Sequence, residues 1–325
     1  MEEPATRAIE PVPLEEIRAA RERLKGAYLR TPLVPLNHEG NSTEISLKLE
    51  NLQPIGSFKL RGSGNAMRLA RPESLAQGVY TASAGNMAQG VAWNARRLGV
   101  ACSVVVPDQA PQTKLDAIER LGGRIVPLPF DRWWQVLVDH GYPEIAGLFI
   151  HPVSDPAVIA GNGTIGLEIL EDLPDADAIL VPFGGGGLSC GIACAAKALR
   201  PQIRVFACEV ETAAPFAASL AADRPVSIDR RASFVDGIGG KSMLPEMWPL
   251  AKKVLDGSIV VSVSEVAEAV RLLAGRNHVV AEGAGAASVA AALTGRAGAG
   301  KIVSVVSGGN IDLSTLSRIF AGETP

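Results

Sequence analysis

The chain has 325 residues, of which 47% are hydrophobic and 5% aromatic, and its formal charge at pH 7 is −3. A chain of this length can bury one large core or two medium cores, and its near-neutral charge argues against nucleic acid or a membrane surface as the main partner. Its N-terminal region is charged and lacks the apolar core of a signal peptide, so we expect a soluble, cytoplasmic protein.

Short runs rich in β-branched residues alternate with alanine-rich stretches along the chain. The runs predict strands at residues 44–49, 78–82, 101–106, 124–128, 149–150, 178–181, 204–209 and 301–306. The stretches predict helices at residues 15–25, 87–98, 113–121, 159–170, 189–199, 263–273 and 284–293. Apolar strands that alternate with helices form parallel sheets covered on both faces, so the sequence predicts an α/β protein.

The lysine at position 59 is the first candidate for chemistry. Lys59 stands between Phe58 and Leu60, just after the turn residues Pro54 and Gly56. An apolar pocket lowers the pKa of a lysine because desolvation disfavours the ammonium form, and the neutral amine can form a Schiff base with a carbonyl. Taken alone, a lysine between two apolar residues is more typical of an ordinary lysine, with a solvated amine and a buried stem, than of a catalytic one.

Glycine-rich segments follow three of the predicted strands, where open α/β sheets bind their ligands. They cover residues 81–86, 182–188 and 307–310. The second contains four consecutive glycines, 184–187, between a buried strand and a helix. Glycine lets successive amides point inward and the helix N-terminus adds positive partial charge, which predicts a phosphate site rather than a flexible loop. The segment matches neither a dinucleotide fingerprint nor a P-loop. A phosphate site and a Schiff-base lysine together indicate pyridoxal phosphate (PLP).

Five motifs in this order resemble the PLP-dependent threonine/serine dehydratase and serine racemase family, a branch of the tryptophan-synthase-β-like, fold type II PLP enzymes. They are SFKLRG (57–62), ASAGN (82–86), GGGGL (184–188), EGAGA (282–286) and SGGN (307–310). The resemblance extends from about residue 31 to residue 316. It implies a homodimer of two-domain subunits with open, twisted, mostly parallel sheets flanked by helices. The large PLP-binding domain would comprise residues 1–78 and 156–325, and a small mobile domain, 79–155, would be inserted in it.

The resemblance also implies roles for individual residues. Lys59 would bind the cofactor and then remove the α-proton of the substrate, while Phe58 would pack against the ring. Asn86 would donate to the ring 3′-oxygen and Ser307 would meet the pyridine nitrogen. A neutral hydroxyl there makes the ring a weaker electron sink, which favours elimination. The other implied cofactor contacts are Gly184, Gly185, Gly186, Gly187, Leu188, Gly237 and Glu282. The loop implied to hold the substrate carboxylate contains Ser83, Ala84, Gly85 and Met87.

Some residues depart from the family pattern. Racemases of the family typically carry a serine at the position of Ala84, which reprotonates the opposite face of the α-carbon, so alanine favours elimination. Met87 replaces a usual histidine and, with Trp133 and Trp134, suits a bulkier β-substituent, although tryptophans more often serve packing. Many relatives bind a divalent cation near the position of Glu209. Glu209 is a candidate ligand here, but the residues around it do not support a cation.

The expected function is that of a PLP-dependent ammonia-lyase whose partner is a small-molecule amino-acid substrate. It would eliminate water from β-hydroxy-α-amino acids such as L-threonine and L-serine, or a bulkier one such as L-phenylserine, to give a 2-oxo acid and ammonia. The alternatives are an amino-acid (serine) racemase, a 3-hydroxyaspartate dehydratase and a non-catalytic PLP-binding protein. The sequence does not decide which β-hydroxy amino acid is preferred.

Overall fold

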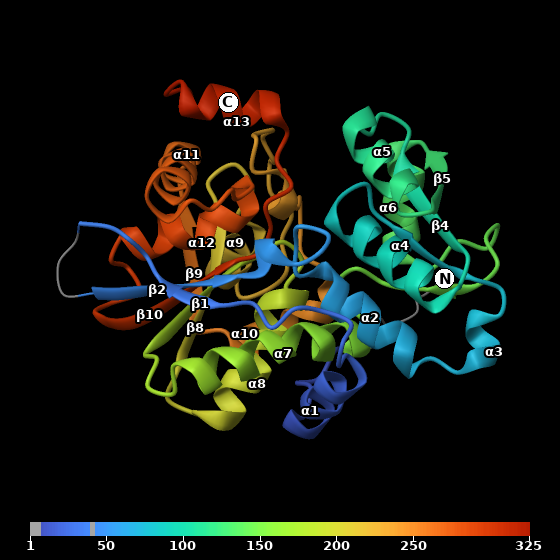
Figure 1. Cartoon of the computed structure of the whole chain (residues 1–325), viewed down its shortest axis with the longest axis horizontal. Helices are drawn as coiled ribbons and strands as arrows, with labels where there is room; N and C mark the ends of the chain where they lie inside the picture. Colours follow the sequence, from blue (N-terminus) through green and yellow to red (C-terminus); the bar gives the residue numbers. More distant parts are fainter. Residues whose placement is uncertain (1–7, 40–42) are drawn as a thin grey trace.

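The structure is a computed structural model that describes residues 8–39 and 43–325, and it contains two sheets side by side (Figure 1). The larger sheet has the strand order β1-β2-β10-β7-β8-β9. Its strands are β1 (Leu33–Pro35), β2 (Thr43–Leu49), β7 (Ala178–Pro182), β8 (Arg204–Val210), β9 (Gly257–Val261) and β10 (Gly300–Val306). Adjacent strands of this sheet pair in parallel, except that β1 is antiparallel to β2.

The smaller sheet has the order β5-β4-β3-β6 and is entirely parallel. Its strands are β3 (Val79–Ala82), β4 (Cys102–Pro107), β5 (Gly123–Leu128) and β6 (Leu148–Phe149). We call residues 79–149 the small lobe, and the larger sheet with the helices packed on it the large lobe. The strands of the smaller sheet all lie within one continuous segment, as an inserted domain requires. The domain boundaries at 78/79 and 155/156 stay a prediction.

Helices cover both sheets, which confirms the predicted α/β class (Figure 1). The small lobe contains α4 (Asn86–Leu98), α5 (Gln112–Arg120) and α6 (Phe130–Val138), and α3 (Pro72–Leu75) precedes it. The other helices are α1 (Leu14–Arg23), α2 (Lys59–Leu69), α7 (Pro156–Asp172), α8 (Gly187–Leu199), α9 (Pro215–Ala222), α10 (Trp248–Val254), α11 (Val263–Leu272), α12 (Gly283–Leu293) and α13 (Leu313–Phe320). Among the described residues, no helix is both long and apolar enough to cross a membrane.

The predicted strands and helices are all present, with ends that differ by a few residues, but the patterns did not predict β1, β9, α2, α3, α9, α10 or α13. Strand β1 has three residues and ends in Pro35, so it offers too short a pattern to detect. Helix α2 contains Gly62 and Gly64, which disfavour a helix in isolation. The helix that carries the tryptophan pair begins at Phe130.

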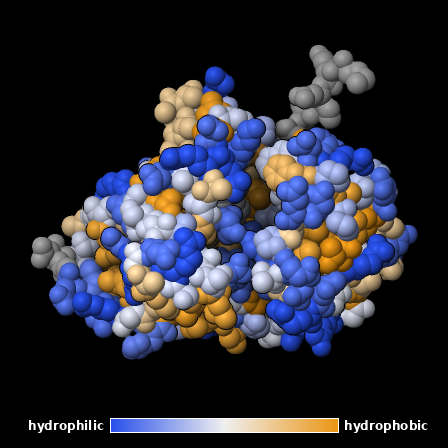
Figure 2. Space-filling model, turned by 90° about the horizontal axis from the view of Figure 1, so that it is seen from above, coloured by the Kyte–Doolittle hydropathy of each residue, from blue (hydrophilic) through white to orange (hydrophobic). Residues whose placement is uncertain are grey.

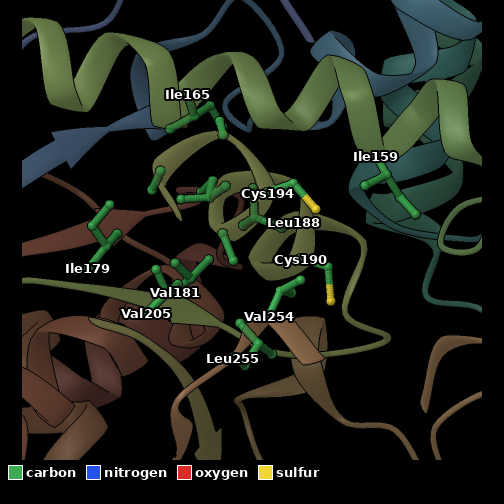
Figure 3. Packing of buried hydrophobic residues seen from close by; sticks show 14 of the residues in the cluster. Ile159, Ile165, Ile179, Val181, Leu188, Cys190, Cys194, Val205, Val254 and Leu255 are labelled. Carbon is green, nitrogen blue, oxygen red and sulfur yellow. The ribbon is translucent and has the colours of Figure 1, made fainter. Parts of the chain in front are cut away.

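Two layers of apolar side chains sandwich the larger sheet. On one face α7 and α8 pack on β7 and β8 through residues such as Ile159, Ile165, Val181 and Val205 (Figure 3). On the other face α11 and α12 cover the sheet. The four cysteines are buried and unpaired, and Figure 3 shows two of them, Cys190 and Cys194, within the first layer.

Helix α7 lies between α2 and α8 at very short range. A Cβ added to Gly161 of α7 would stand 2.6 Å from the carbonyl oxygen of Arg61 on α2. A Cβ added to Gly191 of α8 would stand 2.4 Å from the carbonyl oxygen of Ile159 on α7. Only glycine permits such approaches. Helix α7 therefore fixes the position of the helix that begins with Lys59 relative to the helix that follows the four glycines.

Candidate active site

A cleft of about 870 Å³ separates the two lobes, and Figure 2 shows the surface hollowed there. Both lobes contribute to its lining. The structure brings into this lining every cofactor and substrate residue that the sequence predicted: Phe58, Lys59, Ser83, Ala84, Gly85, Asn86, Met87, Gly184, Gly185, Gly186, Gly187, Leu188, Gly237, Glu282 and Ser307. The individual roles of these residues stay predictions.

Lys59 is the first residue of α2, and its amine is nearly unpartnered. Its Nζ lies 3.4 Å from the carbonyl oxygen of Pro152 and 5.0 Å from the centre of the Phe58 ring. No carboxylate among the described residues forms an ion pair with it. Burial lowers the pKa of Lys59 to about 8, and the nearby charge of Glu282 only partly opposes this effect. A neutral, nucleophilic amine is therefore accessible near pH 8.

The start of α2 is tied to the last glycine segment by backbone hydrogen bonds. The amide of Phe58 donates to the carbonyl oxygen of Ser307 at 3.1 Å, and the amide of Gly309 donates to that of Gly56 at 2.9 Å. The hydroxyl of Ser307 faces the cleft and makes no hydrogen bond with another described residue. Lys59 and this hydroxyl thus have fixed relative positions although they are far apart in the sequence.

The four glycines form a backbone-lined cradle at the N-terminus of α8. The amides of Gly184, Gly185 and Gly186 donate no hydrogen bond to another described residue. Gly186 has a φ of +94°, which favours glycine. The carbonyl of Gly187 accepts a hydrogen bond from the Asn162 side chain at 3.2 Å, which ties the loop to α7. Free amides at a helix N-terminus suit an anion such as a phosphate.

Asn86, the first residue of α4, connects the two lobes beside the cleft. Its Nδ2 donates to Oε1 of Glu282 at 2.8 Å, and its Oδ1 accepts from Nδ2 of Asn310 at the same distance. These two bonds fix the orientation of the amide and leave one Nδ2 hydrogen for another acceptor. Asn310 was not assigned a role from the sequence, although it closes the fifth motif.

Glu282, the carboxyl group that accepts the Asn86 hydrogen bond, is a buried residue of the cleft lining. Burial raises the pKa of Glu282 to about 7, with a further contribution from the charge of Asp236, while the hydrogen bond from Asn86 lowers it. A Cβ added to Gly308 would stand 2.4 Å from Oε1 of Glu282, so a larger residue there would have to displace this carboxyl group. The carboxyl group therefore titrates close to neutral pH.

Buried charges anchor the helix that carries Lys59. The Arg61 guanidinium donates to Glu50 at 2.7 and 2.8 Å and to Glu168 of α7 at 2.6 and 2.9 Å. Lys48 also contacts Glu168, at 2.6 Å, so the two cations balance the two carboxylates. Such an arrangement need not add stability, but breaking it leaves an uncompensated buried charge at a cost of about 3–5 kcal/mol. The motif position of Arg61 gave no indication of this network.

Glu209, the candidate cation ligand, lies outside the cleft lining. Its carboxylate accepts the amides of Phe216 and Ala217 at 2.8 Å each and the Ser258 hydroxyl at 2.6 Å. These donors occupy both oxygens, so Glu209 caps α9 from within the core. In the part of the chain that the structure describes, no group of three or more His, Cys, Asp or Glu side chains is arranged to hold a metal.

Comparison with known proteins identifies the cofactor. Residues 24–308 match the family model described as pyridoxal-phosphate dependent enzyme. The chain belongs to this family. The L-threonine ammonia-lyase of Thermotoga maritima is 40% identical over 314 residues, which are 95% of this chain and 78% of that protein. The catabolic L-threonine dehydratase of Escherichia coli is 38% identical over 317 residues, 95% of this chain and 96% of that protein.

A similar fold occurs in solved structures. Maize serine racemase matches with a TM-score of 0.89 and 31% sequence identity, over 96% of this chain and 98% of that chain. PLP-family membership agrees with the donors in the cleft. Lys59 offers a buried amine of lowered pKa. The glycine cradle offers amides without a partner among the described residues, and Ser307 offers a hydroxyl without one. The residues present therefore fit PLP.

Proposed function

We propose that this PLP-dependent enzyme is an ammonia-lyase that removes water from β-hydroxy-α-amino acids. L-Threonine and L-serine are the small substrates of this class, and L-phenylserine is the larger one. The observation that carries the proposal is Lys59, an amine of lowered pKa in a cleft that also contains an anion cradle. The threonine ammonia-lyase and threonine dehydratase relatives support the same reaction.

The residues of the cleft have separate roles in this reaction. PLP, when bound, supplies an electron sink for the substrate α-carbon. Lys59 removes the α-proton, because the other lysine of the cleft lining, Lys114, is held in an ion pair with Asp236. The glycine cradle would hold the phosphate, Asn86 would donate its free hydrogen to the ring oxygen, and Ser307 would meet the ring nitrogen as a neutral partner.

The overall reaction needs no oxidant or reductant. The α-proton and the β-hydroxyl leave together as one water molecule, which gives an enamine. The free enamine then takes up one water molecule and releases ammonia, so that a 2-oxo acid remains. The enzyme thus has to remove one proton, from one face of the α-carbon only.

Racemisation is the alternative that the cleft supports less. It requires a second proton donor on the opposite face of the α-carbon. Position 84 is alanine, and the only hydroxyls in the cleft lining are those of Ser83 and Ser307. The Ser83 hydroxyl accepts the amide of Gly85 at 3.1 Å, although its own proton stays free. Elimination needs a base on one face of the α-carbon only, whereas racemisation also needs a donor on the opposite face, which alanine at position 84 does not supply.

A dicarboxylic substrate is a further candidate because of one side chain. Arg230 lines the cleft and forms no ion pair with a described residue. A free guanidinium can bind a distal carboxylate, as in 3-hydroxyaspartate. This substrate therefore belongs in the same assay panel.

The test is a substrate panel with PLP-loaded enzyme. L-Threonine, L-serine, L-phenylserine and 3-hydroxyaspartate are assayed for 2-oxo acid and ammonia, and the remaining amino acid is analysed for its D-isomer. We expect equal amounts of 2-oxo acid and ammonia from at least one substrate. Faster formation of the D-isomer than of the 2-oxo acid would replace the lyase by a racemase.

Lys59→Ala tests the residue that carries the proposal. We expect the variant to lose the visible absorption of lysine-bound PLP and at least about a thousandfold in kcat, because both the attachment point and the base are removed. An absorption spectrum and the 2-oxo acid assay measure the two effects. Retention of the wild-type spectrum would show that another amine binds the cofactor.

A further inference from the structure

Helix α6 turns an apolar face toward the cleft. Phe130, Trp133 and Leu137 line the cleft and stand at positions i, i+3 and i+7, which place them on one side of a helix. The rings of Phe130 and Trp133 are 5.5 Å apart at an angle of 43°. We call these three side chains the α6 wall.

The neighbouring tryptophan has a different position. Trp134 follows Trp133 directly but does not line the cleft. Both tryptophans pack on the small-lobe core, and their ring centres are 6.3 Å apart. The polar residues of the helix, Asp131, Arg132 and Gln135, are also absent from the cleft lining. The side of α6 that faces the cleft is therefore entirely apolar, and the sequence alone could not distinguish the two tryptophans.

The α6 wall is connected to Lys59 through a short segment. The Nζ of Lys59 lies 3.4 Å from the carbonyl oxygen of Pro152. The preceding residue, His151, bonds through Nε2 to the carbonyl oxygen of Leu137 at 3.2 Å. Burial lowers the pKa of His151 to about 3, so the ring is neutral and donates this bond. The wall is thus held next to the segment that the reactive amine touches.

Phe130 gives the wall its exposed apolar surface, while Leu137 and Trp133 are anchored in the small-lobe core. Phe130 is 57% exposed, in a chain in which only 5% of residues are aromatic. The indole Nε1 of Trp133 is buried and has no hydrogen-bond partner among the described residues. The charged side chains of the lining come from elsewhere, among them Asp108, Lys114, Arg230 and Asp236. An apolar group of the substrate can therefore cover the wall without desolvating a charge.

We propose that the α6 wall binds the β-substituent and that the preferred substrates are β-hydroxy-α-amino acids with an aromatic ring on the β-carbon. This inference rests on the proposed ammonia-lyase function. The hydrogen of serine or the methyl group of threonine leaves most of the wall uncovered, whereas an aryl ring stacks on Phe130 and Trp133. A single aromatic pair of this kind contributes about a two- to tenfold preference, and loss of a larger apolar contact in a pocket contributes about 10–200-fold.

The experiment compares three variants of the PLP-loaded enzyme. Phe130→Ala and Trp133→Ala alter the wall, and Trp134→Ala is the matched control on the same helix. We measure kcat/KM for L-phenylserine and L-threonine. The wild type prefers phenylserine, and each wall variant lowers the phenylserine-to-threonine ratio about tenfold, while the control leaves the ratio within about twofold. Because Phe130 is largely exposed, Phe130→Ala leaves the core intact.

A binding measurement separates this inference from the proposed function. L-Phenylalanine carries the ring but no β-hydroxyl, so it binds without elimination, and L-alanine is its small counterpart. We expect L-phenylalanine to bind at least about tenfold more tightly than L-alanine and to change the tryptophan fluorescence, and Trp133→Ala to remove this difference. Equal binding of the two amino acids, or the same loss of preference in Trp134→Ala, overturns the inference. Binding without turnover of any hydroxy amino acid overturns the proposed function instead.

Discussion

At the scale of single residues, the cleft contains two ionisable groups whose pKa values move toward neutrality from opposite sides. Burial lowers the pKa of Lys59 to about 8 and raises that of Glu282 to about 7. The motif order predicted that both residues belong to one site. The hydrogen bond by which Glu282 holds Asn86 is a contact between lobes, and no local pattern encodes it.

Glu282 makes stability depend on pH. Its pKa rises from 4.5 to about 7 on folding, so the folded state binds the proton more tightly than the unfolded state. The contribution of this proton to the free energy of unfolding is therefore full below about pH 4.5 and is lost as the pH rises to about 7. Its upper limit is roughly 3 kcal/mol. Lys59 acts in the opposite sense, and stability recovers as the pH rises from about 8 to 10.5.

Glu282→Gln tests this dependence, because glutamine retains an oxygen that accepts the Asn86 hydrogen bond. We expect the free energy of unfolding of the cofactor-free variant, measured in urea, to fall much less between pH 4.5 and 7 than that of the wild type. The variant-minus-wild-type difference in this free energy should therefore be about 1–3 kcal/mol larger at pH 7.5 than at pH 5. Parallel stability curves for the two proteins would show that Glu282 is not titrating in this range.

At the scale of elements, α2 illustrates how packing overrides local preference. Its sequence contains two glycines and was not predicted to be helical, yet it carries the catalytic candidate Lys59. The helix forms because Arg61 is bonded within the large lobe while Ala66 and Met67 pack on the core of the small lobe. Helices with clear apolar periodicity, such as α4 and α11, were predicted because their signal is local.

The close packing of α7 and α8 gives a prediction with a matched control. Gly191→Ala places a methyl group 2.4 Å from the carbonyl oxygen of Ile159, so α8 has to move away from α7. We expect a loss of about 1–3 kcal/mol in unfolding free energy and weaker PLP binding, because the glycine cradle moves with α8.

Gly275→Ala is the control, since an added Cβ there meets nothing within 4 Å. Alanine is the better helix former, so this variant should keep or gain up to about 1 kcal/mol and bind PLP like the wild type. Thermal unfolding and PLP titration measure both variants. Equal effects at the two positions would contradict the packing argument.

At the scale of the whole molecule, polar contacts join the two lobes around the cleft. Lys114 on α5 pairs with Asp236, and Thr113 donates to Asp312 at 3.1 Å. Farther along the small lobe, His140 contacts Glu246 at 3.1 Å. These contacts all connect segments that are distant in the sequence. They are partly exposed, so each contributes little, and their effect falls with ionic strength.

Lys114→Met removes one contact across the cleft. We expect KM to rise by at most about fivefold at low salt, because the lobes separate more easily, and the effect to shrink at high salt. Amide exchange in α5 should become faster. Lys197→Met is the control, since Lys197 pairs with Asp256 inside the large lobe with similar exposure. Faster exchange of α5 in both variants would argue against a role of Lys114 between the lobes.

The sequence by itself determined the α/β class, most strands and helices, the PLP cofactor and a set of residues that line one cleft, because these depend on periodicity and on short ordered motifs. Only the tertiary structure decided which residues touch across the lobes: the bonds of Asn86, the capping role of Glu209 and the different positions of Trp133 and Trp134. The physical reason is that a motif specifies chain direction and local shape, whereas the face that a helix turns toward the cleft depends on how distant segments pack.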